Sequence, residues 1–152
     1  MNILIINGSP RIHGNISAML DAIREEAEQR GAEVTTVLAS RLQVKPCYWG
    51  NMPGQLKIIF DRIVYGMIGE DTRGLPLPLH KGKKAILIST STTPFPFNIL
   101  FGQSRGAIKA MREILKWSGF KVVSAIELGG TRQHPAGEKV LNRCRKAIKK
   151  CM

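Results

Sequence analysis

Residues 1–20, MNILIINGSPRIHGNISAML, decide the fold, because an apolar run, a glycine-containing loop and a helical pattern follow one another without interruption. Residues 3–6 are continuously apolar, which is typical of a strand covered on both faces. From Ile16 onward, apolar residues recur at the spacing of a helix that buries one face. Asn15 suits the N-cap of this helix and Gly31 suits the position just after its end. The stretch therefore predicts a buried strand joined by a short loop to an amphipathic helix.

The loop NGSPRIHGN, residues 7–15, has the composition of a phosphate-binding turn. A loop between a strand and a helix directs backbone N–H groups and the positive end of the helix dipole at one point. Ser9, Asn15 and Ser17 can donate hydrogen bonds to an oxyanion, and Arg11 can add a charge-assisted contact. The loop has neither the G-K-[ST] of a Walker loop nor the G-x-G-x-x-G of a dinucleotide site. It predicts a phosphate monoester site; the alternative is an ordinary capped turn.

Strands and helices alternate along the rest of the chain. Further apolar strands are predicted at 34–38, 85–89 and 122–126. Further helices are predicted from about Pro53 to Met67, over 108–115 with an end before Gly119, and over 140–151. This alternation predicts an α/β fold with a mainly parallel sheet. The segments 66–83 and 90–102 are predicted loops, and loops at the carboxyl ends of parallel strands are where ligands bind in open α/β sheets.

Length and composition bound the class of protein. The chain has 152 residues, which predicts a single domain over 1–152, and its net charge of +12 favours anionic partners. No apolar run reaches the roughly 20 residues that span a bilayer. The N-terminus is interpreted as a strand and not a signal peptide, so a cytoplasmic protein is expected. Nucleic-acid binding is not favoured, because no aromatic residues interleave with the basic residues of the last helix.

Three longer stretches resemble one family. IINGSPRIHGNIS resembles the phosphate loop of the NAD(P)H-dependent FMN reductases, whose pattern is G-S-P-R-x-x-G-N-[ST]. YWGNMPGQLKIIFDR resembles the second signature of that family, and the segment from KGKKAILIST to SGFKVV resembles its next strand, loop and helix. The resemblance implies a flavodoxin-like three-layer sandwich with strand order 2-1-3-4-5 and FMN beyond strands 1 and 3.

The resemblance also implies which residues bind FMN. At matching positions, the phosphate would be held by Ser9, Arg11, Asn15, Ile16 (through its backbone) and Ser17. The isoalloxazine ring would lie along Tyr48, Trp49, Gly50, Asn51 and Met52. The other side of the ring could be approached by Ser91, Thr92 and Thr93. The alternatives are that the two aromatic residues belong to the core, that Asn51 caps a helix, and that residues 91–93 are loop filler.

The implied activity is that of an FMN-dependent NAD(P)H oxidoreductase of the flavin or quinone reductase type. The nicotinamide would pass a hydride to FMN, and FMN would reduce a second, small-molecule acceptor. No catalytic side chain is expected, and the three histidines all fall in predicted loops. No metal site is expected either: Cys47, Cys144 and Cys151 form no C-x-x-C, and an iron–sulfur cluster normally needs four thiolates.

The segment VKPCYWGNMPGQLK, residues 44–57, departs from the family pattern. Only eleven residues separate Ala39 from Asn51, whereas a crossover between parallel strands takes about a dozen or more. The usual central strand 3 is therefore missing or replaced. The strand at residues 3–6 could pair directly with 85–89, residues 42–48 could substitute for the missing strand, or a second chain could complete the sheet.

We expect a compact sheet of about four strands, in a homodimer. Because the support of the ring-side loop is altered, the alternative function is a non-catalytic flavodoxin-like binding domain or shortened variant with weak or lost flavin binding.

Overall fold

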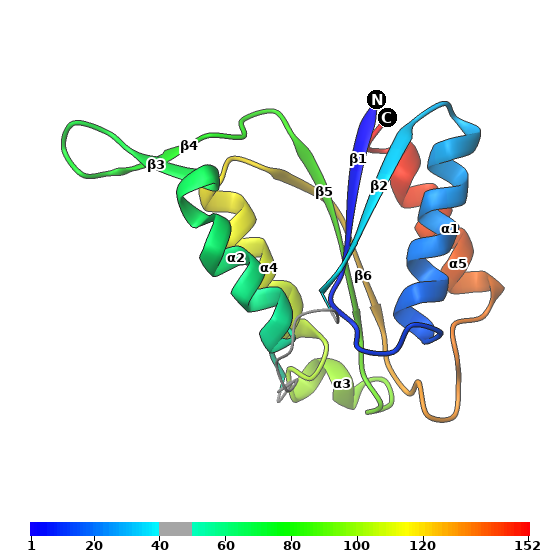
Figure 1. Ribbon diagram of the computed structural model, residues 1–152. Helices are drawn as coiled ribbons and strands as arrows, with labels where there is room; N and C mark the ends of the chain where they lie inside the picture. The colour runs from blue at the N-terminus through cyan, green and yellow to red at the C-terminus, as the bar shows by residue number, and fades with distance from the viewer. Residues whose placement is uncertain (40–49) are drawn as a thin grey trace.

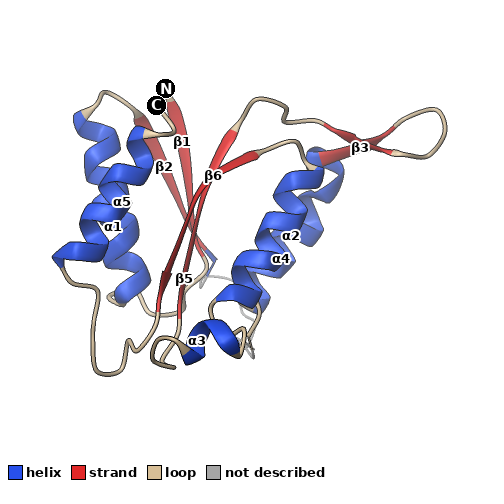
Figure 2. Cartoon of the chain, turned by 180° about the vertical axis from the view of Figure 1, so that it is seen from behind, coloured by secondary structure: helices blue, strands red, loops and turns tan. Residues whose placement is uncertain are grey.

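The computed structural model describes residues 1–39 and 50–152, which form three layers (Figure 1). Parallel strands make the middle layer, with α1 and α5 on one side and α2 and α4 on the other, as both ribbon views show (Figures 1 and 2). The helices are α1 (Asn15–Gln29), α2 (Gly54–Met67), α3 (Phe97–Leu100), α4 (Arg105–Trp117) and α5 (Glu138–Lys149). The strands are β1 (Asn2–Asn7), β2 (Glu33–Leu38), β3 (Ile68–Glu70), β4 (Pro76–Pro78), β5 (Lys84–Thr90) and β6 (Lys121–Leu128).

The strands and helices expected from the apolar pattern are all present, within a few residues of their expected ends. The predicted end of α1 is confirmed: Gly31 has φ +76°, and the N–H of Ala32 reaches the carbonyl of Ala27 over 3.0 Å. The predicted N-cap is wrong, because Gly14 takes that position and Asn15 is already helical. The last helix ends at Lys149, so Cys151 lies beyond it and not on its face.

The four parallel strands form two separate pairs among the described residues. β1 pairs with β2, and β5 pairs with β6, each in parallel register. The expected direct pairing of the first strand with 85–89 is therefore wrong, although the α/β flavodoxin-like class is confirmed. In the strand order 2-1-3-4-5 that the resemblance implies, a third strand lies between the counterparts of β1 and β5, and the described residues include no such strand. The substitute strand proposed for 42–48 lies entirely outside the described residues.

Apolar packing joins the two strand pairs where hydrogen bonds do not. One cluster of buried residues combines Ile5 of β1 and Ile126 of β6 with the inner faces of α1 and α5. A second cluster consists mainly of residues of α2 and α4 and includes Leu87 of β5. The partly buried Ile6 of β1 packs against it. Each pair thus contributes side chains to both cores, so the middle layer is held together through the helices that cover it.

The segment 66–83 was expected to be a loop, and that expectation is wrong. β3 and β4 form an antiparallel hairpin that projects from the body of the protein (Figure 1). Its turn is organised by Asp71, whose Oδ1 accepts the N–H groups of Arg73 at 2.8 Å and Leu75 at 2.9 Å. These backbone bonds, with the Arg73 side chain, lower the pKa of Asp71. No helix among the described residues is long and apolar enough to cross a membrane.

Candidate functional site

The loop between β1 and α1 is held by hydrogen bonds within itself. Asn7 accepts the N–H of Ser9 at 2.9 Å and donates to the hydroxyl of Ser17 at 3.2 Å. The Ser17 hydroxyl in turn donates to the carbonyl of Arg11 at 3.2 Å, and the Ser9 hydroxyl accepts the N–H of Arg11 at 3.2 Å. The Ser17 hydroxyl proton is thus used inside the loop, which differs from its expected donation to a ligand. The Ser9 hydroxyl proton remains available.

The first turn of α1 presents backbone donors at this loop. The first bond along the helix runs from the N–H of Ala18 to the carbonyl of Gly14, so the N–H groups of residues 15–17 have no acceptor within the helix. No side chain caps this end, and its first turn holds no acidic residue. Asn15 instead uses its Oδ1 to accept the N–H of Ala136 at 2.7 Å, which anchors the loop after β6. This bond uses only the oxygen of the Asn15 amide, so its NH₂ group can still donate.

The electrostatics of this end of the sheet favour an anion. Besides α1, both α2 and α4 start here, and neither has an acidic residue in its first turn. Each helix N-terminus carries a partial positive charge of roughly half an elementary unit. Arg11 lies exposed on the loop and adds a full charge. All three helices therefore direct the positive end of their dipole toward this end of the sheet, which favours anionic groups there.

The ring-side segment meets α4 through glycine contacts. Gly50 has φ +71°, a conformation that favours glycine. A methyl group added to Gly106 would overlap the carbonyl oxygen of Gly50, so the two backbones touch directly. Next to Gly50, the side chain of Asn51 accepts the N–H of Met52 at 2.7 Å; Pro53 is the residue that caps α2. Asn51 is exposed and Met52 is buried, so of these two only Asn51 lies open to a ligand.

The phosphate loop and the ring-side segment are neighbours. A Cβ added at Gly8 would lie 3.2 Å from the side chain of Leu56, in the first turn of α2. The loop after β1 therefore packs on the helix that follows residues 50–53. The structure brings these two predicted halves of the site together. Tyr48 and Trp49 lie outside the described residues, and their predicted role stays a prediction.

The third predicted group, Ser91 to Thr93, follows β5 and connects to the loop after β6. The N–H of Ser91 donates to Leu128 at 2.8 Å, and the carbonyl of Thr93 accepts the N–H of Gly130 at 2.8 Å. The Ser91 hydroxyl accepts the N–H of Thr93 at 3.1 Å. Thr92 is exposed between them. Ser91 and Thr93 thus shape the loop, and Thr92 is the member free to contact a ligand.

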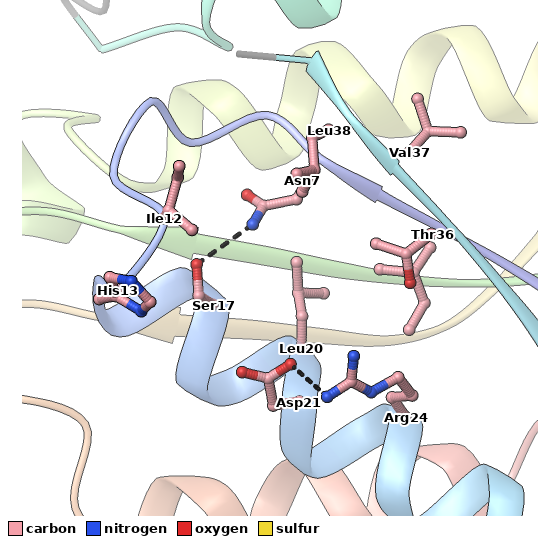
Figure 3. A pocket seen from close by; sticks show the side chains of 11 residues that line it. Asn7, Ile12, His13, Ser17, Leu20, Asp21, Arg24, Thr36, Val37 and Leu38 are labelled. Atoms are coloured by element: carbon pink, nitrogen blue, oxygen red, sulfur yellow. Dashed lines mark hydrogen bonds and ion pairs between the residues drawn. The ribbon is translucent and has the colours of Figure 1, made fainter. Parts of the chain in front are cut away.

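A pocket of about 560 Å³ lies behind the phosphate loop, between α1 and β2 (Figure 3). Its walls come from the loop residues Ile12 and His13, from α1 and from residues 36–38 of β2. Asp21 and Arg24 form an ion pair at 3.0 Å on its α1 side. Of the predicted cofactor residues that the structure describes, only Ser17 lines this pocket. The pocket therefore borders the phosphate loop but is not lined by the other predicted cofactor residues that the structure describes.

A buried polar network at the same end of the sheet was missed by sequence reasoning. The hydroxyl of Ser104 donates to Glu127 at 2.6 Å and accepts the side-chain N–H of Asn98 at 3.0 Å. Ser104 and Asn98 are 0% and 2% exposed. Asn98 and Ser104 are six residues apart, Glu127 lies 23 residues after Ser104, and the three form no known motif. Only the unusual presence of Glu127 at the end of an apolar strand could have pointed to the network.

Two family models match the chain. The model described as "Flavodoxin-like fold" matches residues 42–151, and the model of the NADPH-dependent FMN reductases matches residues 1–45. Because the first match covers more than half of the sequence, the chain belongs to the flavodoxin-like-fold family. The two matches meet at residues 42–45, beside the departure from the family pattern after Ala39. A search of curated proteins found no match.

Solved structures share this fold at low sequence identity. Smu.1420 from Streptococcus mutans is 20% identical with a TM-score of 0.76, over 99% of this chain and 100% of that one. The FMN-dependent NADH-azoreductase of Bacillus anthracis, solved in complex with FMN, is 14% identical with a TM-score of 0.71, over 98% and 96% of the two chains. A putative quinone reductase from Klebsiella pneumoniae is 17% identical with a TM-score of 0.67, over 99% and 83%. These likenesses establish the flavodoxin-like fold.

Proposed function

We propose that this protein is an FMN-dependent NAD(P)H oxidoreductase of the flavin or quinone reductase type. The observation that carries the proposal is the free N-terminus of α1: three backbone N–H groups without helical acceptors, no acidic residue and the exposed Arg11 beside them. The match of residues 1–45 to the NADPH-dependent FMN reductases supports the same assignment. The net charge of +12 favours the approach of anionic FMN and nicotinamide nucleotides.

The described residues fit FMN in both parts. The N–H groups of residues 15–17, the Ser9 hydroxyl and the Arg11 guanidinium are donors suited to a phosphate monoester. Residues 50–52 follow at the adjacent loop, where the backbone of Gly50 and the exposed Asn51 would lie along the ring. When bound, FMN supplies the redox chemistry by accepting a hydride from the nicotinamide and reducing a second acceptor. The protein binds, orients and shields it.

The rim of the site supports an aromatic acceptor. Phe95, Phe97 and Phe101 are 75%, 48% and 68% exposed on the loop and short helix that follow β5. The rings of Phe97 and Phe101 stack with centroids 5.8 Å apart. Exposed apolar patches of this kind mark ligand or protein contacts more often than chance. A planar acceptor such as a quinone or a flavin would bury these rings while it reaches the cofactor.

A homodimer is also part of the proposal. β1 and β5 each pair on one edge only among the described residues, and Leu4 of β1 is 61% exposed. Unpaired strand edges and exposed apolar side chains are both association-prone. A native mass measured at micromolar protein concentration tests this: a dimer supports the proposal, and a monomer at every concentration contradicts it.

Titration with FMN tests the binding proposal, with quenching of flavin fluorescence as the signal. Arg11→Ala should weaken binding about tenfold, because a hydrogen bond to a charged group is worth roughly 1.5 kcal/mol or more. Arg112→Ala, which removes an exposed arginine from α4, serves as the control for net charge. Equal losses in the two variants would mean that Arg11 acts only through the overall charge.

The separation of the two strand pairs favours one alternative, a non-catalytic flavodoxin-like domain. Loose support of about 1 Å is enough to impair a binding site. NAD(P)H oxidation by the FMN-loaded protein distinguishes the two. Turnover that depends on both FMN and a quinone supports the oxidoreductase, whereas FMN binding without NAD(P)H oxidation supports the binding domain.

A further inference from the structure

Ser104 occupies a position that normally caps a helix, yet its side chain does something else. It is the N-cap residue of α4, where serine usually accepts an N–H of the first turn. Here no side-chain cap bond forms. The hydroxyl instead spans from Asn98, near α3, to Glu127, near the end of β6. The fully buried Ser104 hydroxyl makes no capping bond and instead links the start of α4 to β6.

The directions of these hydrogen bonds are fixed by the charge of Glu127. A carboxylate only accepts, so Ser104 must donate to it and can only accept from Asn98. The NH₂ group of Asn98 must then face Ser104, which leaves Asn98 Oδ1 buried and without a partner among the described residues. Arg105 Nε lies 3.8 Å from the other oxygen of Glu127 and supports its charge. A buried oxygen without a hydrogen-bond partner costs free energy. The bond between Asn98 and Ser104 is therefore formed at the expense of a bond to Asn98 Oδ1.

The network continues to the ring-side segment. Two residues after Ser104, Gly106 lies against the carbonyl oxygen of Gly50. On the other side, a Cβ at Gly129 would lie 2.7 Å from Cγ of Asn98, so the end of β6 also packs on the network. Any displacement of the first turn of α4 would therefore move Gly50 directly.

We propose that Glu127, Ser104 and Asn98 are positioning residues that set the first turn of α4, and through Gly106 the backbone of Gly50, against the isoalloxazine ring of FMN. The inference rests on the proposed function. None of the three side chains is assigned a contact with the cofactor.

The test compares two buried serines of the same helix. Ser118 lies at the other end of α4, is also 0% exposed, and donates to the carbonyl of Ile114 at 2.8 Å. Ser104→Ala and Ser118→Ala each delete one buried hydrogen-bonding hydroxyl. Ser104→Ala should lower thermal stability more, because it leaves Asn98 and Glu127 without that partner, whereas the carbonyl of Ile114 keeps its bond to the N–H of Ser118. Only Ser104→Ala should weaken FMN binding, by about fivefold or more, the change expected when a buried group loses its partner.

A second readout does not need the cofactor. In the FMN-free protein, Ser104→Ala should shift the backbone amide resonances of Gly50 and Asn51, and Ser118→Ala should leave them in place. This keeps the two proposals separate: a wild-type protein that binds no FMN contradicts the proposed function, while the Gly50 resonance still decides the positioning role. Unmoved Gly50 resonances in Ser104→Ala, or equal shifts in both variants, would overturn the inference.

Variants of Glu127 keep the test decisive if Ser104→Ala does not fold. Glu127→Gln retains a side chain that can bond Ser104 and should remain close to the wild type in Gly50 shift and FMN affinity. Glu127→Ala should shift the Gly50 resonance and weaken FMN binding in the way predicted for Ser104→Ala. If both single variants fold, the double variant Ser104→Ala/Glu127→Ala should lose no more than either one, because both remove the same interaction. Independent, additive losses in FMN affinity would contradict a connected network.

Discussion

The contact between Gly106 and Gly50 makes a sharp prediction for Gly106→Ala. The new methyl group would overlap the carbonyl oxygen of Gly50, which is backbone and cannot rotate away. Forcing an extra methyl into a packed region costs about 1–3 kcal/mol, and Ala gains at most about 1 kcal/mol over Gly in a helix. Because the overlapped atom belongs to the backbone, the upper part of this range, about 2–3 kcal/mol, applies. After a helix gain of about 1 kcal/mol the net loss is roughly 1–2 kcal/mol, which lowers the Tm of a chain of this size by roughly 2–8 °C.

Gly66 provides the matched control. It also lies in a helix, near the end of α2, but a Cβ at this position meets nothing within 4 Å. Gly66→Ala should therefore stabilise the protein by about 0.5–1 kcal/mol, because it restricts the unfolded chain and favours the helix. Thermal unfolding followed by circular dichroism measures both variants.

The prediction extends to binding. Gly106→Ala should also weaken FMN binding, since it displaces the ring-side backbone, while Gly66→Ala should not. A Gly106→Ala protein with wild-type or higher Tm and unchanged FMN affinity would refute the direct contact between α4 and residue 50.

Three further predictions follow from other parts of the structure. The pKa of Asp71 is lowered in the folded state, so its carboxylate stabilises the hairpin turn above about pH 4, and this stabilisation is lost as the pH falls through the lowered pKa. The backbone amide shifts of Arg73 and Leu75 should follow this titration. Asp71→Asn should abolish the pH dependence of these shifts. Burial raises the pKa of Cys144 to about 11 and also raises the pKa of the partly buried Cys151. In a Cys47→Ser background, iodoacetamide should modify Cys151 before Cys144. The reverse order would contradict the packing of α5. Gly129→Ala should push Asn98 away from Ser104 and lower Tm, whereas Gly66→Ala, whose added Cβ meets nothing within 4 Å, should not.

Sequence patterns predicted the elements better than their pairing. The apolar runs of β1, β5 and β6 were clear because most of their side chains are at least partly buried. β2 was recognised from its β-branched residues, although most of its side chains are exposed. Their partners were not, since periodicity says nothing about which strand edges meet. The hairpin of β3 and β4 escaped because its strands have three residues each and prolines occupy both ends of β4.

In the candidate site too, the features that are local in the sequence were predicted and those that depend on tertiary packing were not. The phosphate loop is local in sequence, so its glycines, serines and arginine could be recognised before the structure. Even there the details differed, as Gly14 and not Asn15 caps α1 and the Ser17 hydroxyl turns inward. The network of Asn98, Ser104 and Glu127 could not be predicted, because only the folded chain brings its members together. The contact of Gly50 with Gly106 depends on tertiary packing for the same reason.

The central claim is that this flavodoxin-like chain, despite its two separate strand pairs, still binds FMN and uses it to oxidise NAD(P)H. The most direct measurement adds FMN to the purified protein, removes the unbound cofactor, and follows the visible flavin spectrum during anaerobic addition of NADPH or NADH. The account predicts retained flavin absorption that bleaches with the nucleotide and returns when a quinone is added. A protein that retains no FMN, or holds FMN that neither nucleotide bleaches, would contradict it.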